Sequence, residues 1–143
     1  MTLDAKGRMA VPARYRDDIA RVCQGQLVVT VDQDGCLLVY PASVWERIQD
    51  QLVALPASDR AVKKLRRLMI GYATDVELDT AGRIRISQEL RDFAELGRKV
   101  ILIGQGNKFE LWDEEAWSEG CDDWRKDAAE NNEQSTALAD FTW

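Results

Sequence analysis

The chain contains no histidine among its 143 residues. This absence excludes Ser-His-Asp and Cys-His catalytic triads, an imidazole general base, and zinc sites that depend on histidine ligands. No nucleophile–base pair and no cofactor-binding loop stands out elsewhere in the chain. We therefore expect a protein that acts by binding and is not an enzyme, with no metal, cofactor or small-molecule substrate.

Cysteine and long apolar segments are also scarce. Cys23, Cys36 and Cys121 are irregularly spaced and include no C-x-x-C pair, so they form no metal or redox motif. Three such thiols are compatible with a reducing cytoplasm. The longest apolar runs, Leu27–Val31 and Val100–Ile103, have the length of strands and are too short to span a bilayer. We expect a soluble cytoplasmic protein without a membrane partner.

Positive charge is in short supply overall, but it is unevenly distributed. The chain has 19 basic and 25 acidic residues and a net charge of -6, an unfavourable balance for binding a polyanion. Residues 1–112 contain 17 basic and 15 acidic residues, whereas residues 113–143 contain 2 basic and 10 acidic residues. The acidity belongs to the C-terminal segment, so the two parts must be judged separately as partners for nucleic acid.

The chain contains an internal repeat. Residues 3–17, LDAKGRMAVPARYRD, resemble residues 78–92, LDTAGRIRISQELRD, at one constant offset. A second block follows in each copy, at an offset smaller by 3. Its matched residues are Val28, Gln33 and Trp45 with Val100, Gln105 and Trp117, and Tyr40 lies opposite Trp112. Two matched blocks in the same order indicate a duplication.

Each copy is predicted to contain the same series of elements. A turn precedes a short strand at 8–11 or 83–86. A short helix follows, with Pro12 expected at its first helical position in the first copy and Ser87 as its N-cap in the second. Hairpins are expected from 27–31 with 36–40 and from 100–103 with 108–112. A capping-box pattern, Ser43-x-x-Glu46, marks the closing helix of the first copy, and Asp113 is a candidate cap in the second.

A further helix is expected between the copies, from about 59 to 69, with Gly71 as its C-terminal stop. Its apolar stripe is Leu65, Leu68, Met69 and Tyr72. The predicted organisation is a first repeat at 1–55, a linking basic amphipathic helix at 56–75, a second repeat at 76–119 and an acidic tail at 120–143. The tail is expected to be a frayed helix or a disordered arm.

The most specific chemical feature is Asp-x-x-Gly-Arg, which occurs from Asp4 to Arg8 and again from Asp79 to Arg83. Glycine adopts positive φ freely and aspartate bonds its own backbone, so the pattern favours a tight turn. The planar guanidinium of arginine binds a phosphate or a guanine edge with two hydrogen bonds. Two such groups in a pseudo-symmetric unit suit a pseudo-symmetric ligand, and duplex DNA is one.

Other interpretations of these charges stay open at this point. The Asp–Arg pairs are also compatible with plain surface turns, and Asp4 with Asp79 is formally a catalytic carboxylate pair that lacks a partner for a second role. The basic run 63–67 is a solvated face, a phosphate contact or a partner for acids on a neighbouring subunit. Further cations near the motifs are Lys6, Arg14 and Arg16 in the first copy and Arg85 and Arg91 in the second.

These residues together resemble the MraZ family of bacterial transcriptional regulators, in the AbrB/MazE-like superfamily. The resemblance covers nearly the whole chain except the tail. It rests on the doubled LD-x-x-GR motif at 3–8 and 78–83, VPARYR at 11–16, LLVYP at 37–41, WERI at 45–48, RRLMIGYATD at 66–75 and GQGNKFELWDEEAW at 104–117.

The resemblance implies an α+β fold in which two tandem pseudo-symmetric repeats form a small interleaved β-barrel with short helices outside. It also implies ring-shaped homo-oligomers that bind direct repeats of double-stranded DNA upstream of the division and cell wall gene cluster. The family's DNA-contacting signature, Asp-x-x-x-Arg, falls on Asp4 and Arg8 and again on Asp79 and Arg83. Family members usually carry a Phe-Arg-Gly-containing segment before the first motif, so we expect a shortened first strand here.

We therefore predict a sequence-specific DNA-binding transcriptional regulator that is cytoplasmic and nucleoid-associated. The predicted DNA-binding residues are Asp4, Lys6, Arg8, Arg14, Arg16, Asp79, Arg83 and Arg85. The alternative is a protein-interaction module of the antitoxin type, whose acidic tail binds a partner. Antitoxin chains usually carry one copy of the motif, which favours the first interpretation.

Overall fold

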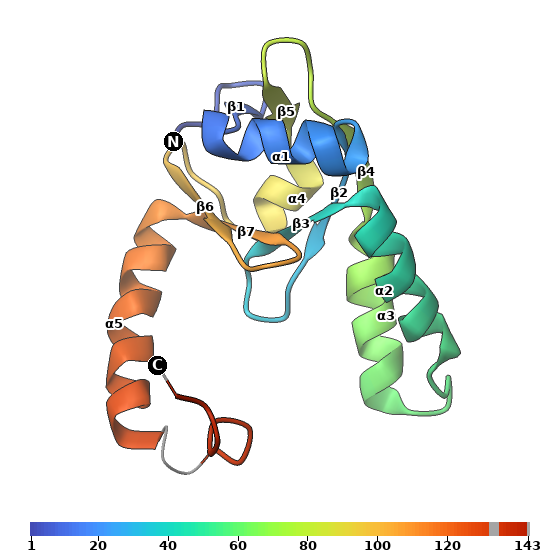
Figure 1. Ribbon diagram of the computed structural model, residues 1–143, viewed down its shortest axis with the longest axis vertical. Coiled ribbons are helices and arrows are strands. Elements are labelled where there is room, and N and C mark those ends of the chain that lie inside the picture. Colours follow the sequence, from blue (N-terminus) through green and yellow to red (C-terminus); the bar gives the residue numbers. More distant parts are fainter. Residues whose placement is uncertain (132–134, 143) are drawn as a thin grey trace. The chain divides into compact units, whose positions relative to one another are not determined.

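The computed structural model describes residues 1–131 and 135–142 (Figure 1). Residues Met1–Asp113 form one compact unit, and a second unit begins at Glu114. Strands and helices alternate along the chain. In order they are β1 (Arg8–Ala10), α1 (Ala13–Cys23), β2 (Gln26–Val31), β3 (Leu37–Pro41), α2 (Ala42–Ala54), α3 (Arg60–Tyr72), β4 (Thr74–Glu77), β5 (Arg83–Arg85), α4 (Gln88–Phe93), β6 (Val100–Gly104), β7 (Phe109–Asp113) and α5 (Glu114–Asn131).

Two antiparallel sheets organise the first unit, and each combines strands from both repeats. β1 and β5 form a two-stranded ribbon, and the larger sheet has the order β4-β2-β3-β7-β6. In the ribbon Met9 lies opposite Ile84, and in the larger sheet Leu38 lies opposite Glu110. Each of these residues faces its own equivalent in the other repeat. This is the register expected of a duplicated chain with a pseudo-twofold axis.

The predicted α+β class is confirmed, but the interleaved barrel is not. Among the described residues, neither strand of the ribbon pairs with the larger sheet, and the edge strands β4 and β6 do not pair with each other. The ribbon strands have only 3 residues each. Their inward side chains, Met9 and Ile84, pack in the same core as the larger sheet and so join the ribbon to it. The N-terminal segment adds a single bridge, between Thr2 and Lys99.

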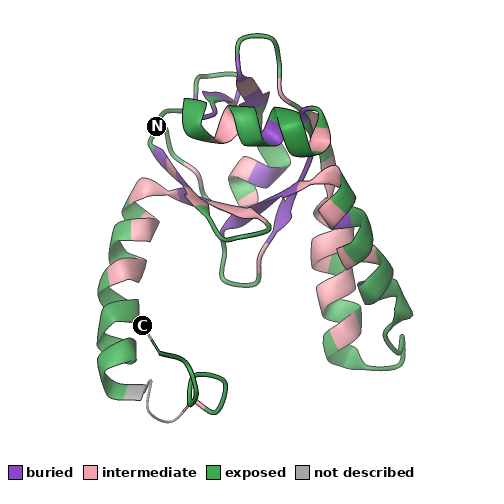
Figure 2. Ribbon diagram, viewed as in Figure 1, coloured by how far each residue is buried: buried purple, intermediate pink, exposed green. Residues whose placement is uncertain are grey.

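The core lies between the ribbon and one face of the larger sheet (Figure 2). Met9 and Ile84 point into it from the ribbon, and Ile19 and Leu90 reach it from α1 and α4. On the opposite face, the α2–α3 helix pair packs against β2 and β3 (Figure 1), and the Thr30 hydroxyl there donates a hydrogen bond to the Met69 carbonyl. The central strands are consequently buried on both faces, which makes the sheet a rigid support for the ribbon.

Two helices begin at side-chain caps, of which the sequence predicts the one at Ser87. Asp59 caps α3, because its side chain accepts hydrogen bonds from the N–H groups of Ala61 and Val62. Ser87 caps α4 by accepting from Leu90 N at 3.4 Å. These short polar side chains satisfy N–H groups that have no partner within the helix.

Other local predictions were wrong. α2 begins directly after Pro41 and has no side-chain cap, so Ser43 lies inside the helix. Pro12 occupies the N-cap position of α1 instead of its first helical position. α3 continues through Gly71, which meets open space. The packing of α3 against α2 and β2 outweighs the modest cost of one glycine in a helix.

The C-terminal segment is helical over much of its length. α5 extends to Asn131, and within this second unit the rings of Trp117 and Trp124 meet edge to face at 5.3 Å. The expectation of a helix is therefore met through residue 131. The part of the tail prediction that concerns residues 132–134 and 143 lies outside the described residues.

Candidate nucleic-acid interface

The first Asp-x-x-Gly-Arg segment forms a tight turn in which one carboxylate holds both backbone and side chain. Oδ1 of Asp4 accepts hydrogen bonds from the N–H groups of Lys6 and Arg8, both at 2.9 Å. Oδ2 accepts from Nε of Arg8 at 2.8 Å. Gly7 has a φ of 81°, a conformation that glycine adopts at little cost. The turn therefore fixes the position from which Arg8 projects.

The second copy repeats this geometry. Oδ1 of Asp79 accepts from the N–H groups of Ala81 at 2.9 Å and Arg83 at 2.8 Å, and Oδ2 accepts from Nε of Arg83 at 3.3 Å. Gly82 has a φ of 75°. The prediction that the aspartate shapes the turn is confirmed in both copies, and in each copy the same carboxylate also holds the arginine. The longer Nε contact makes the second arginine the less tightly held of the two.

Both carboxyl groups are stabilised in their charged form. The pKa of Asp4 lies below its ordinary value chiefly because the Arg8 N–H bonds the carboxylate, with desolvation opposing and the guanidinium adding to the effect. The pKa of Asp79 is lowered for the same reason by the Arg83 N–H, with desolvation again opposing. At neutral pH both carboxylates are therefore ionised, and each one binds its arginine.

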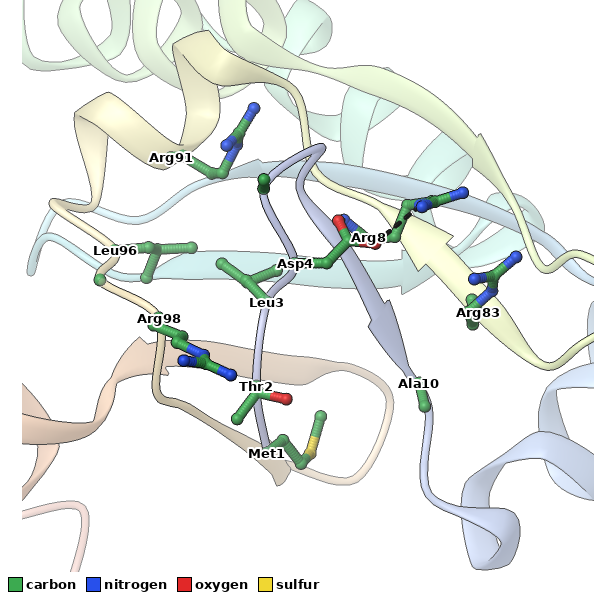
Figure 3. Close-up of a pocket in the computed structure, with 12 residues that line it drawn as sticks. Met1, Thr2, Leu3, Asp4, Arg8, Ala10, Arg83, Arg91, Leu96 and Arg98 are labelled. Atoms are coloured by element: carbon green, nitrogen blue, oxygen red, sulfur yellow. Dashed lines mark hydrogen bonds and ion pairs between the residues drawn. The ribbon is translucent and has the colours of Figure 1, made fainter.

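The two arginines and a third lie on one face of the β1–β5 ribbon. Arg8 lies opposite Arg85, and Arg83 lies opposite Ala10. Side chains alternate between the faces of a strand, so Met9 and Ile84 between them face the core and the arginines face outward. Figure 3 shows the guanidinium groups of Arg8 and Arg83 pointing toward the same side.

The terminal guanidinium nitrogens of Arg8 and Arg83 are available for a ligand. The aspartates engage Nε, while no hydrogen bond joins the terminal nitrogens of Arg8 or Arg83 to another described residue. Their side chains are 37% and 40% exposed. A guanidinium anchored at Nε with two outward nitrogens is preorganised for bidentate binding of phosphate or a guanine edge.

The other predicted residues lie in different settings around this face. Lys6 is exposed at the tip of the first turn, and its carbonyl accepts a hydrogen bond from Nε of Arg85 at 3.2 Å. Arg14 is exposed on α1, with its guanidinium 4.8 Å from the Tyr15 ring centre. Arg16 is half-buried, because its side chain covers Gly82.

An open groove of about 990 Å³ adjoins the ribbon and adds two arginines to the surface (Figure 3). Arg91 and Arg98 line this groove together with Arg8 and Arg83. The repeat offered a signal for Arg91, which is the equivalent of Arg16. No sequence pattern marked Arg98, because it reaches this position only through the packing of the segment before β6 against residues 1–3.

Other kinds of site find no support in the described part of the chain. No group of three or more Cys, Asp or Glu side chains there is arranged to hold a metal ion. Cys36 is fully buried, and burial raises the pKa of its thiol to about 12, as is expected of a cysteine that packs like a small apolar residue. None of the described helices combines the length and apolar character needed to cross a membrane.

Comparison with known families identifies two tandem matches. A family model described as "MraZ protein, putative antitoxin-like" matches residues 1–68 and again residues 69–140. The two matches together span nearly the whole chain and divide it between its two repeats.

Individual relatives agree with this assignment. A protein of Thioalkalivibrio sulfidiphilus (strain HL-EbGR7) named "Transcriptional regulator MraZ" is 54% identical over 138 residues, which cover 96% of this chain and 92% of the relative. Proteins with the same name from Methylococcus capsulatus and Pseudomonas putida (strain F1) are each 51% identical, over 90% and 82% of this chain and 85% and 79% of their own lengths.

Proposed function

The chain belongs to the MraZ family, and from this premise we propose that it is a sequence-specific DNA-binding transcriptional regulator. Its sites would be repeated promoter elements upstream of the bacterial division and cell wall gene cluster, its own gene included. Its place of action would be the cytoplasm, in association with the nucleoid. It performs no chemistry and regulates by occupying DNA.

One observation carries the proposal: two arginines, each fixed by its own aspartate, project from the outer face of one two-stranded ribbon. A two-stranded ribbon fits the major groove of B-DNA. Because the carboxylates fix the arginines before DNA arrives, little side-chain entropy is lost on binding. The relatives named transcriptional regulators support a DNA-binding role for the chain as a whole.

The predicted residues take different roles in the proposal. Arg8 and Arg83 provide the bidentate contacts, and Asp4 and Asp79 orient them. Lys6, Arg14 and Arg85 contribute positive charge toward phosphates at the rim of the same surface. Arg16 acts indirectly in this proposal, through its contact with Gly82 in the second turn.

We further propose that the active form is a ring-shaped homo-oligomer. One subunit brings only a few cations to DNA, and each charge contact alone is weak. Several copies on one ring face several DNA repeats at once, so each contact after the first takes place at high effective concentration. The proposal therefore requires the DNA to carry repeats.

A mobility-shift titration tests this function directly. The probe is the DNA upstream of the protein's own gene cluster, and the control is the same fragment with its repeats scrambled. We expect binding only to the intact repeats and a steep loss of affinity between 50 and 200 mM salt, because phosphate neutralisation releases counterions: about 0.9 log units per log unit of salt for each phosphate. Equal binding of both fragments at every salt concentration would contradict the proposal.

The alternative, an antitoxin-type interaction module, draws on the acidic character of α5. Its exposed acidic residues include Glu115, Glu119, Asp122 and Asp123, and the family description itself refers to antitoxins. Pull-downs with the full chain and with a chain lacking residues 120–143 separate the two functions. Retention of one partner enzyme by the full chain alone would favour the interaction module.

A further inference from the structure

Each arginine-bearing turn is covered by an arginine from the other repeat. The guanidinium of Arg16, on α1, packs over Gly82 so closely that a Cβ added there would lie 2.5 Å from both Cδ and Nη1. Arg91, on α4, packs over Gly7 in the same way, with its Nε 2.8 Å from an added Cβ. Arg16 and Arg91 are repeat equivalents, so the arrangement is reciprocal.

Backbone hydrogen bonds from the opposite repeat also reach the same two glycines. The N–H of Val11 donates to the Gly82 carbonyl at 2.9 Å, and the N–H of Ile86 donates to the Gly7 carbonyl at 2.7 Å. These two bonds are also equivalent under the repeat. Each glycine is therefore enclosed between a strand end and a helix arginine, and each turn owes its support to the opposite repeat.

The two arginines are held differently. Nε of Arg91 donates to the Ile86 carbonyl at 3.1 Å. Nε of Arg16 is buried and has no hydrogen-bond partner among the described residues. Both residues are half-buried, and each packs against a turn glycine of the opposite repeat. A side chain in this setting is better placed to support a turn than to meet a phosphate.

We propose that Arg16 and Arg91 are positioning residues, each of which holds the opposite repeat's Asp-x-x-Gly-Arg turn in its DNA-binding geometry. Arg16 fixes the turn that presents Arg83, and Arg91 fixes the turn that presents Arg8. The two DNA-contacting arginines are thereby coupled across the pseudo-twofold axis. This inference rests on the proposed function only where it concerns DNA.

Charge-preserving variants separate positioning from direct contact. Lysine still neutralises a phosphate, but it lacks the planar group that covers a glycine. We expect Arg16→Lys and Arg91→Lys in the full chain to bind the promoter fragment about tenfold more weakly, because a misplaced turn loses much of one bidentate contact. The dependence of log affinity on log salt should keep its slope, because the weakened contact is one to a guanine edge and the lysine keeps its positive charge.

The matched control is Arg21→Lys. Arg21 lies on the same helix as Arg16, is exposed, and pairs with Asp18 at 2.9 Å, so its replacement should leave DNA affinity unchanged. Unchanged affinity in Arg16→Lys and Arg91→Lys would overturn the proposal. A loss of affinity together with a slope reduced by about 0.9 would also overturn it, because that is the signature of a lost phosphate contact.

Hydrogen–deuterium exchange provides a second measurement that does not depend on DNA. In Arg16→Lys, amides of residues 79–85 should exchange faster, and in Arg91→Lys those of residues 4–10 should do so, each in the repeat opposite to the substitution. Faster exchange confined to the substituted repeat, or no change, would overturn the proposal. Failure of the wild-type protein to bind promoter DNA, with the crossed exchange pattern present, would refute the proposed function and leave the structural coupling intact.

Discussion

At the scale of single residues, the two oxygens of Asp4 carry separate tasks. Oδ1 accepts two backbone N–H groups and shapes the turn, whereas Oδ2 accepts only Nε of Arg8. The same division holds at Asp79. Turn formation and arginine orientation can therefore be separated by a substitution that changes one oxygen.

Asp4→Asn is expected to keep the turn and release the arginine. The asparagine carbonyl oxygen can replace Oδ1 as an acceptor, but its amide group then opposes the Nε donor of Arg8. Promoter affinity should fall about tenfold with only a small change in the urea midpoint of unfolding. Asp18→Asn, which removes an exposed pairing with Arg21, is the matched control. Unchanged affinity in Asp4→Asn would contradict the orienting role.

The lowered pKa values of Asp4 and Asp79 predict a pH dependence of stability. A carboxyl whose pKa is lower in the folded state stabilises the protein above its ordinary value of 3.8, and this contribution is lost as pH falls through the lower, folded-state pKa. The wild type should therefore unfold at higher urea concentration than Asp4→Asn/Asp79→Asn at pH 7. The difference should shrink on acidification below 3.8, and an equal difference at pH 7 and pH 3 would refute the assignment.

At the scale of elements, each turn requires glycine for two reasons: the backbone has a positive φ there, and an arginine of the other repeat packs too closely to leave room for a Cβ. Gly82→Ala would place a Cβ against Arg16 at a φ of 75°. Gly35→Ala makes an ideal control, because Gly35 also has positive φ, 94°, but open space around it. We expect Gly82→Ala to lower the free energy of unfolding by about 3 kcal/mol and Gly35→Ala by about 1 kcal/mol. Equal losses in chemical denaturation would argue against close packing at the turn.

Local patterns predicted the elements well where the residues themselves determine the structure. The ribbon strands, both hairpins, the start of the helix near Asp59 and the cap at Ser87 were all predictable from turn residues and periodicity. The start of α2 was not, because Pro41 at the end of β3 starts the helix before the Ser43 box is reached. Alternation of apolar and polar residues predicts which face of a strand is buried. No local pattern indicates which other strand it pairs with.

The pairing of elements between repeats explains why the interface could be only partly predicted. The doubled motif identified Arg8 and Arg83 and the aspartates that hold them. Two long-range arrangements stayed hidden: Arg16 packs on Gly82 of the other repeat, and Arg98 lines the groove beside the ribbon. Such contacts depend on which strand of one repeat pairs with which strand of the other.

At the scale of the whole molecule, the charge is divided between the two units. The unit with the arginine ribbon is close to neutral, and the net charge of -6 comes from the C-terminal segment. A negative segment repels DNA at any sequence, and a specific contact must overcome that repulsion. We therefore predict that the acidic segment weakens binding to DNA of any sequence.

Removal of the acidic segment should therefore increase affinity for random DNA. A chain lacking residues 120–143 is expected to bind a scrambled fragment more tightly than the full chain at 50 mM salt, with the gain lost at high salt because screening removes the repulsion. A full-length variant with Asp122→Asn, Asp123→Asn and Asp127→Asn tests the charge without shortening α5. Unchanged or weaker binding of random DNA by both proteins would contradict this role.

The central claim is that Arg8, fixed by Asp4, reads DNA. Its most direct test is the affinity of Arg8→Ala for the intact promoter repeats, measured by mobility shift beside Arg21→Ala. We expect Arg8→Ala to lose specific binding while its circular dichroism and urea midpoint stay close to those of the wild type, and Arg21→Ala to bind normally. Retained specific binding by a folded Arg8→Ala protein would contradict the account.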